Sequence, residues 1–213
     1  MLVWMPAAHT LPPDQLTVRE RLLEAATAVI DEVGEEHLTL AQVVRRAGLT
    51  TGAVYSNFSN REELVVAVYL HQYAGRMWEG VDRLGEFLDG DAHGEAFVEG
   101  LAAQLIRPDD PAFRTSRWLR VRALAASQRY EQVRVAVTDL QEQIAARLVE
   151  IIRRAQQRGD IDPSRDPHAL AFLFQQFGFA LVLHDMSGDQ APEPDAWVEL
   201  ARDLILPLFP GRT

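Results

Sequence analysis

The sequence predicts an all-helical protein of about nine helices. Apolar residues recur every three or four positions along most of the chain, which is the spacing of one face of an α-helix. The alternation of apolar and polar residues that marks a half-buried strand is absent from the sequence. Paired capping residues and glycines divide the periodic stretches into separate helices. The predicted fold class is therefore all-α.

Composition places the chain among ordinary globular proteins, with 47% hydrophobic and 24% charged residues. Cysteine is absent, which excludes disulfides, thiolate metal sites and cysteine nucleophiles. The formal net charge of −10 argues by itself against nucleic-acid binding, because phosphate contacts need basic groups. The stretch from Thr39 to Arg61, however, contains three arginines and no acidic residue. This segment could therefore form a small surface suited to DNA although the whole chain is acidic.

The first helix is predicted to begin directly after Thr17. Residues 1–15 contain three prolines and no periodicity, which predicts a flexible N-terminal arm rather than a signal peptide. Thr17 and Glu20 have the spacing of a capping box, and Gly34 is placed to end the helix.

Two short helices follow, with a tight turn between them. Thr39 and Gln42 form a second capping box, and Gly48 ends the helix that they begin. Either Thr50 or Thr51 caps the next helix. Two short helices joined by a glycine-containing turn of three or four residues have the geometry of a helix-turn-helix. The sequence thus predicts this motif near residues 39–58.

The outward face of the third helix is predicted to carry small polar groups and one aromatic ring. Such side chains suit phosphate oxygens, base edges and thymine methyl groups. Arg61 would lie in the first turn of the fourth helix, where a bound phosphate would offset the unfavourable helix dipole. Short capped helices also build ordinary bundles, in which Tyr55 would be a core residue. The residues expected on the outward face are Thr50, Thr51, Gly52, Tyr55, Ser56 and Asn57.

Two segments of this region resemble the N-terminal domain of the tetracycline-repressor (TetR) family of transcriptional regulators. They are R-x-x-L-L-E-A-A at 19–26 and T-L-A-Q-V-V-R-R-A-G-L-T-T-G-A-V-Y-S-N-F-S-N-R-E-E-L at 39–64. Three positions differ from the residues usual in the family: Val44, Asn57 and Arg61. The differences leave the operator sequence undetermined. By the resemblance, the DNA-facing residues are Thr39, Thr50, Thr51, Gly52, Tyr55, Ser56, Asn57 and Arg61.

The resemblance also implies a second domain that binds an effector and forms a homodimer. We therefore expect a DNA-binding domain over residues 16–62 and an effector-binding and dimerisation domain over 63–213. Helical spacing predicts one helix running on to about residue 88, followed by helices near 95–106, from Pro111 onward, over 131–158, over 167–185 and near 195–208.

The last two predicted helices are the expected dimer interface. The helix over 167–185 is apolar around most of its circumference, so it needs two buried faces, its own core and a partner subunit. A two-fold dimer holds its recognition helices roughly 34–36 Å apart, or a multiple of that, which predicts a palindromic operator. The longest apolar stretch is short for a membrane span, so we expect a cytoplasmic protein without membrane contact.

A pocket for a small apolar or aromatic effector is expected among the middle helices, because aromatic residues are enriched there. For each residue taken singly, plain hydrophobic core is the simpler interpretation. The candidate effector contacts are Met77, Trp78, Phe97, Phe113, Trp118, Leu124, Phe174 and Phe177.

Other chemistry finds no support in the sequence. The six histidines lack metal-binding spacing, and no nucleotide-binding or hydrolase motif occurs. We therefore predict no cofactor, no metal, no catalytic residue and no enzymatic activity. The expected function is a ligand-responsive regulator, with repression the expected mode, that binds double-stranded DNA. A protein-binding adaptor that keeps the helix-turn-helix shape is the alternative. The acidic net charge motivates it, and the surface from Thr50 to Arg61, which has no acidic residue, disfavours it.

Overall fold

A computed structural model describes residues 16–105 and 111–210, and every regular element in those ranges is helical. The predicted all-α fold class is therefore confirmed. The predicted arm over 1–15 and the turn before Pro111 lie outside the described residues.

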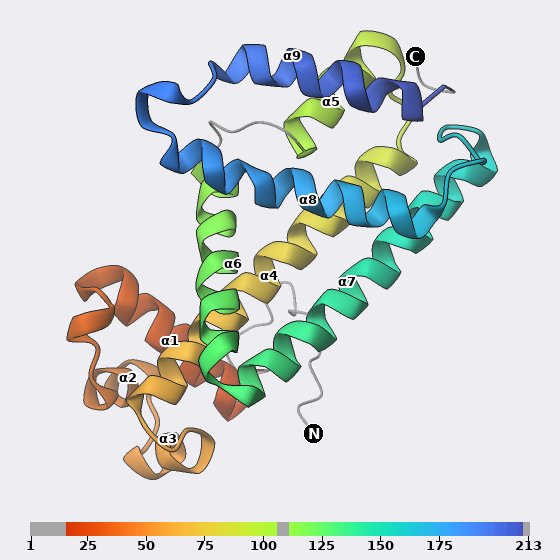
Figure 1. The fold of residues 1–213 in the computed structure, drawn as a ribbon. Helices are drawn as coiled ribbons and strands as arrows, with labels where there is room; N and C mark the ends of the chain where they lie inside the picture. The colour runs from red at the N-terminus through yellow and green to blue at the C-terminus, as the bar shows by residue number, and fades with distance from the viewer. Residues whose placement is uncertain (1–15, 106–110, 211–213) are drawn as a thin grey trace. The chain divides into compact units, whose positions relative to one another are not determined.

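The α-helices follow the predicted order (Figure 1). They are α1 (Val18–Val33), α2 (Leu40–Ala47), α3 (Thr51–Asn57), α4 (Arg61–Asp89), α5 (Gly94–Leu105), α6 (Pro111–Arg129), α7 (Glu131–Arg158), α8 (Pro167–Met186) and α9 (Pro194–Ile205). The 3₁₀ turns η1 (Glu35–His37) and η2 (Gly188–Gln190) join α1 to α2 and α8 to α9, and a third, η3 (Leu206–Leu208), follows α9. The last predicted helix ends slightly early, because its final turn tightens into η3.

The chain divides into two compact units. The first contains residues up to 75 together with 122–137, and the second contains 76–121 together with residues from 138 onward. Helices α4, α6 and α7 each contribute residues to both units. The domain limits at 16–62 and 63–213 remain a prediction.

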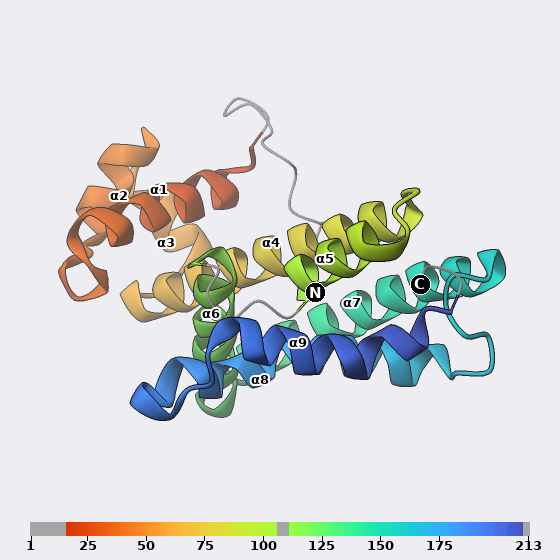
Figure 2. The ribbon, with the colours of Figure 1, turned by 90° about the horizontal axis from the view of Figure 1, so that it is seen from above.

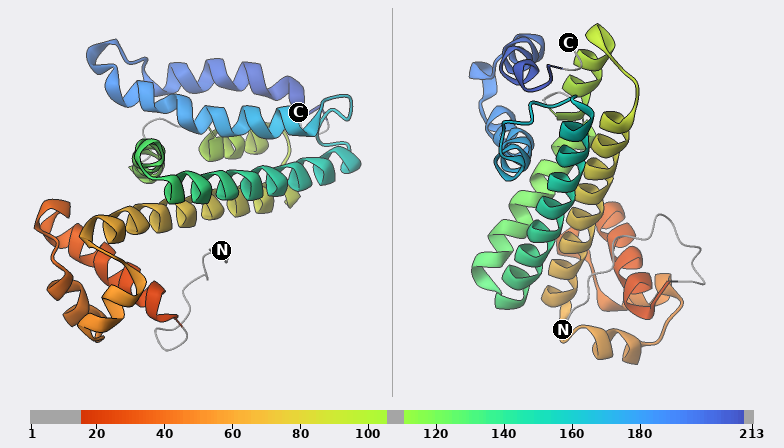
Figure 3. Two further views of the ribbon diagram at one scale, coloured as in Figure 1. Left: turned by 60° about the horizontal axis from the view of Figure 1, so that its bottom comes forward. Right: turned by 90° about the vertical axis from the view of Figure 1, so that its right-hand side faces the viewer.

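In the first unit, local capping fixes three helices around a small core. Thr17 and Thr39 each complete the predicted capping box, and Gly34 ends α1 with a φ of 85°. Gly48 adopts the left-handed conformation at the end of α2, with a φ of 63°, which a glycine does without steric cost. Helices α1, α2 and α3 pack together (Figure 3), and Val43 of α2 is fully buried.

In the second unit, aromatic rings hold the C-terminal end of the described chain. The Phe97 ring stacks on Phe87 at a centroid distance of 5.4 Å and contacts Phe209 at 5.1 Å. Phe174 stacks on Phe209 from α8 at 6.2 Å. Helix α5 packs against both α8 and α9, which run alongside each other in opposite directions (Figures 1 and 2).

Candidate functional site

Helix α3 is held by one buried face and one cap. Thr50 is its N-cap, and its side-chain oxygen accepts a hydrogen bond from the backbone N–H of Ala53 at 3.3 Å. This resolves the choice between Thr50 and Thr51. Val54 and Phe58 are buried in the core of the unit. The two buried anchors lie four residues apart, so the rest of this short helix is free to face outward.

The outward face of α3 carries the residues that the sequence analysis placed there. Thr50, Thr51, Gly52 and Ser56 are exposed, and Tyr55 is 59% exposed. Asn57 is half-buried, and its side-chain amide donates a hydrogen bond to the Ala53 carbonyl at 2.8 Å. Thr39 is exposed at the start of α2. Contact of these residues with DNA remains a prediction.

Arg61 is engaged within the fold. Its Nε donates to the Leu38 carbonyl at 2.9 Å, and its Nη2 donates to the Glu35 carbonyl. The guanidinium therefore ties the segment before α2 to the start of α4. Contact between Arg61 and DNA stays a prediction, and it would use guanidinium N–H groups other than those that bind these two carbonyls.

Two arginines on α1 position the motif, and the sequence analysis missed both. Arg19 donates to the Asn57 carbonyl at the end of α3 at 3.1 Å, and its guanidinium lies 4.5 Å from the centre of the Phe58 ring. Arg21 donates to the Ala47 carbonyl at the end of α2 at 2.8 Å. A cation at a helix C-terminus satisfies open carbonyls and complements the dipole. Arg19 and Arg21 lie two residues apart, directly before the apolar residues of α1, and this pattern could have indicated their role in the sequence.

Burial lowers the pKa of the Arg19 guanidinium from its usual value, while the nearby charge of Glu63 acts in the opposite direction. An arginine keeps its proton under all ordinary conditions, so Arg19 remains a cation at the end of α3.

A tyrosine on α4 connects η1 to α6 within the first unit. The Tyr69 hydroxyl donates to the Glu35 carboxylate at 2.5 Å, and the Arg122 guanidinium lies 4.9 Å from the centre of the Tyr69 ring. Burial, and next the hydrogen bond to Glu35, raise the pKa of Tyr69 to about 12. The phenol therefore stays protonated near neutral pH and keeps this hydrogen bond.

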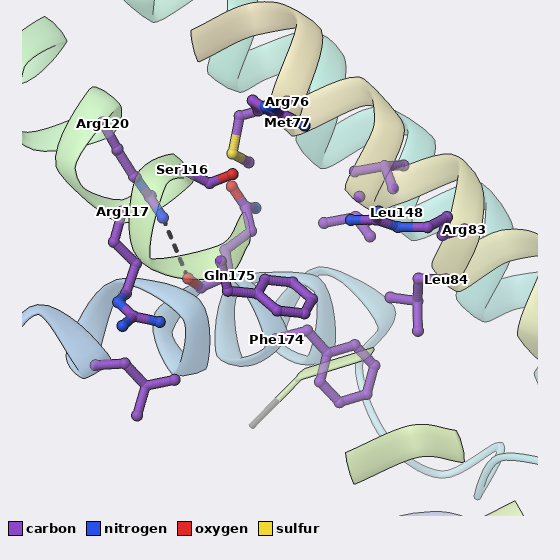
Figure 4. Close-up of a pocket in the computed structure, with 14 residues that line it drawn as sticks. Arg76, Met77, Arg83, Leu84, Ser116, Arg117, Arg120, Leu148, Phe174 and Gln175 are labelled. Atoms are coloured by element: carbon purple, nitrogen blue, oxygen red, sulfur yellow. Dashed lines mark hydrogen bonds between the residues drawn. The ribbon is translucent and has the colours of Figure 1, made fainter. Parts of the chain in front are cut away.

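The second unit contains a cavity of about 130 Å³ lined by four helices (Figure 4). Met77, Phe113 and Phe174, which the sequence analysis proposed as effector contacts, are among its lining residues. The full lining within the described chain is Arg76, Met77, Gly80, Val81, Arg83, Leu84, Phe113, Ser116, Arg117, Arg120, Leu148, Phe174, Gln175 and Leu181.

The other proposed effector contacts lie elsewhere. Five of the proposed contacts are not among the described residues that line the cavity: Trp78, Phe97, Trp118, Leu124 and Phe177. Phe97 is fully buried in the aromatic cluster, and Leu124 belongs to the first unit. Whether any of them meets a ligand remains untested.

The sequence analysis missed the arginines of the cavity. Arg117 and Arg120 follow Phe113 at the i, i+4, i+7 spacing of one helical face, and this pattern was the available signal. Within the residues described, no group of three or more His, Asp or Glu side chains is placed to hold a metal ion.

Two family models match the chain. The model described as "Bacterial regulatory proteins, tetR family" matches residues 22–68, which contain the helix-turn-helix. The model described as "Tetracyclin repressor-like, C-terminal domain" matches residues 121–197. The chain belongs to the TetR family. It is therefore a DNA-binding transcriptional regulator with a helix-turn-helix, and the resemblance seen in the sequence is confirmed.

Relatives and solved structures agree with the TetR assignment along nearly the whole chain. The HTH-type transcriptional regulator TtgR of Pseudomonas putida is 26% identical over 199 residues, covering 88% of this chain and 90% of TtgR. The structure of Salmonella enterica GusR aligns with a TM-score of 0.58 at 23% identity, covering 92% of this chain and 97% of GusR. A transcriptional regulator from Saccharomonospora viridis in complex with choline aligns with a TM-score of 0.58 at 17% identity, covering 88% and 95% of the two chains.

Helix α8 of this TetR-family protein is long and apolar enough to cross a membrane when length and composition alone are considered. One such helix is weak evidence, because the core helix of a soluble protein passes the same test. Asp185 near its end pairs with Arg117 of α6, and the Asp185 side chain is only 4% exposed. This buried ion pair fits a helix packed within a protein.

Proposed function

We propose that this TetR-family regulator is a cytoplasmic repressor that binds a palindromic operator as a homodimer and is released by a small apolar or aromatic effector. The exposed face of α3 carries the proposal. It presents Tyr55 and small polar side chains in a stretch that has no acidic residue between Thr39 and Arg61. Such a surface approaches DNA phosphates without like-charge repulsion.

Dimerisation through α8 and α9 is supported by apolar side chains that the single chain leaves exposed. Phe172, Leu183 and Met186 on α8 are between 65% and 71% exposed. Leu200 and Leu204 on α9 are 57% and 66% exposed. Burying such a patch against a second copy stabilises a dimer, and a two-fold axis repeats the same surface on both subunits.

The proposed release by an effector is supported by the way α6 is shared between the two units. Residues 111–121 of α6 belong to the unit with the cavity, and residues 122–129 belong to the unit with the helix-turn-helix. A ligand that prefers one position of α6 shifts the population of DNA-competent molecules by that preference. The choline complex of the Saccharomonospora viridis protein supports small-molecule binding in this fold.

Footprinting on DNA upstream of the protein's own and neighbouring genes tests the proposal. We expect protection of an approximate palindrome at moderate salt, and a Tyr55→Ala variant that folds normally but loses the protection. Val135→Ala, which alters an apolar side chain that is 47% exposed on α7, is the matched control and should protect the same site. A wild-type protein that protects no site but captures a single protein tightly would favour the adaptor.

A further inference from the structure

We propose that the cavity of the second unit takes an organic anion, a single aromatic ring that bears a carboxylate. The inference rests on the proposed function, because it specifies the effector of the same cavity. It goes beyond an apolar or aromatic effector by assigning the ligand a negative charge and a size.

The charged side chains that line the cavity are all cationic. Four arginines line it, and no Asp or Glu occurs among its described lining residues. Arg76 pairs with Glu79 outside the lining at 3.2 Å. Arg117 forms two hydrogen bonds with Asp185, Nη2 to Oδ1 at 2.7 Å and Nε to Oδ2 at 3.1 Å. These two arginines therefore have carboxylate partners in the fold.

Arg83 and Arg120 have a different environment. Within the described part of the chain, neither has a carboxylate oxygen within 4.0 Å. The Arg83 guanidinium lies 5.7 Å from the centre of the Phe113 ring, and the Arg120 guanidinium lies 4.8 Å from that of Phe179. Their positive charges face aromatic rings, which attract a cation more weakly than a carboxylate does. Arg83 is exposed to solvent, whereas Arg120 is half-buried. Arg120 therefore gives the cavity a positive charge that a neutral or cationic ligand would not balance.

Arg120 supplies the specific donor. Its Nη1 donates to the Gln175 carbonyl at 3.2 Å, as Figure 4 shows. Its Nε is buried and has no hydrogen-bond partner among the described residues. A buried donor without an acceptor is unfavourable, and a carboxylate accepts from a guanidinium through two parallel hydrogen bonds. Since Nε is shielded from solvent, binding requires the long Arg120 side chain to change rotamer, and this movement takes place on α6.

The walls and the volume define the rest of the ligand. Met77, Leu84, Phe113, Leu148 and Phe174 provide apolar surface around the arginines. The volume of about 130 Å³ is close to that of an apolar protein cavity that holds one benzene ring. A single ring therefore fits, and its carboxylate would be directed to Arg120.

A charge series on the wild-type protein tests the inference without any mutation. Calorimetric titration at pH 7 compares benzoate, benzamide and benzylamine, which share a ring and differ in charge. We expect benzoate to bind and the other two to bind at least about tenfold more weakly, since each loses a charge-assisted hydrogen bond. Equal or tighter binding of benzamide or benzylamine, or no detectable binding of benzoate, would overturn the inference.

Variants then locate the carboxylate. Arg120→Gln should weaken benzoate by about tenfold or more while leaving the weak benzamide binding unchanged, and Arg120→Lys should recover part of the affinity because it keeps the charge. Arg153→Gln, at an exposed α7 arginine outside the lining, is the matched control. If Arg120→Gln does not fold, Arg83→Gln provides the second test. Benzoate affinity that is unchanged in both cavity variants contradicts the assignment.

The titration does not depend on DNA, so its failure is separable from failure of the proposed function. A protein that footprints a palindrome but prefers benzamide remains a repressor with a different effector class. A protein that binds benzoate through Arg120 but protects no DNA keeps the inference about the cavity and loses the proposed role in repression.

Discussion

The arginines of the helix-turn-helix and the arginines of the cavity are held in different ways. In the first unit, Arg19, Arg21 and Arg61 all donate to main-chain carbonyls and so fix the helix-turn-helix. In the second unit, the cavity residues Arg83 and Arg120 lie over the rings of Phe113 and Phe179, and Arg120 also donates one hydrogen bond to the Gln175 carbonyl. Each arginine of the first group directs its hydrogen bonds to the backbone and holds it in place, whereas Arg120 keeps a buried Nε without a hydrogen-bond partner among the described residues and can exchange its ring contact for an anion. The first arrangement suits a rigid reading surface, and the second suits a site that responds to a ligand.

Breaking the buried ion pair of the second unit is expected to have the largest effect. Asp185→Asn leaves the Arg117 guanidinium, 3% exposed, without its carboxylate. Removing one partner of a buried pair lowers the free energy of unfolding by about 3–5 kcal/mol. Urea denaturation followed by circular dichroism measures the change. Asp203→Asn, at an exposed pair with Arg202, is the control and should change stability by less than about 0.5 kcal/mol. Similar losses of unfolding free energy in Asp185→Asn and Asp203→Asn would contradict the expected difference between the buried and the exposed ion pair.

The next largest effect concerns the anchor of α3. Phe58 is 1% exposed, and its truncation in Phe58→Ala should cost about 3 kcal/mol through lost burial and the resulting cavity. Because the Arg19 guanidinium loses the ring beneath it, DNA affinity should fall as well.

Tyr55→Ala on the exposed face of the same helix should reduce DNA affinity with almost no loss of stability. Denaturation and gel-shift titration of both variants separate the two effects.

This comparison also explains what the sequence could predict. The helix-turn-helix was predictable because its signals are local: Thr39 with Gln42, Gly48 and Thr50 act on backbone groups within a few residues. The engagement of Arg61 with the Leu38 carbonyl was not, since the two are 23 positions apart and nothing local pairs them. The cavity is harder still, because its lining comes from four helices. Aromatic enrichment pointed to Phe113 and Phe174, yet equally to Phe97, which the structure places in the core.

A smaller effect is expected from the cation at the end of α2. Arg21→Met removes the hydrogen bond to the Ala47 carbonyl and should lower the free energy of unfolding by about 1.5 kcal/mol. The turn that follows α2 loses an anchor, so DNA affinity should fall with it. Arg46→Met, at the exposed pair with Glu32, is the matched control for stability and should stay within about 0.5 kcal/mol of the wild type. An unchanged denaturation midpoint in Arg21→Met would show that this arginine does not hold the motif.

The smallest expected effect is a dependence of the free energy of unfolding on pH that arises from Tyr69. It tests whether the hydrogen bonds of the first unit hold its elements in place. Its pKa is about 12 in the folded protein and about 10 in an unfolded chain, so the folded state holds the phenolic proton more tightly. The associated stability is fully present below about pH 10 and is lost as the pH rises toward about 12. Allowing for solvent screening, we expect the wild type to lose roughly 1 kcal/mol more than Tyr69→Phe across this window. Urea denaturation at a series of pH values measures the difference, with the exposed Tyr55→Phe as control. Parallel curves for the wild type and Tyr69→Phe would mean that the bond between Tyr69 and Glu35 does not stabilise the fold.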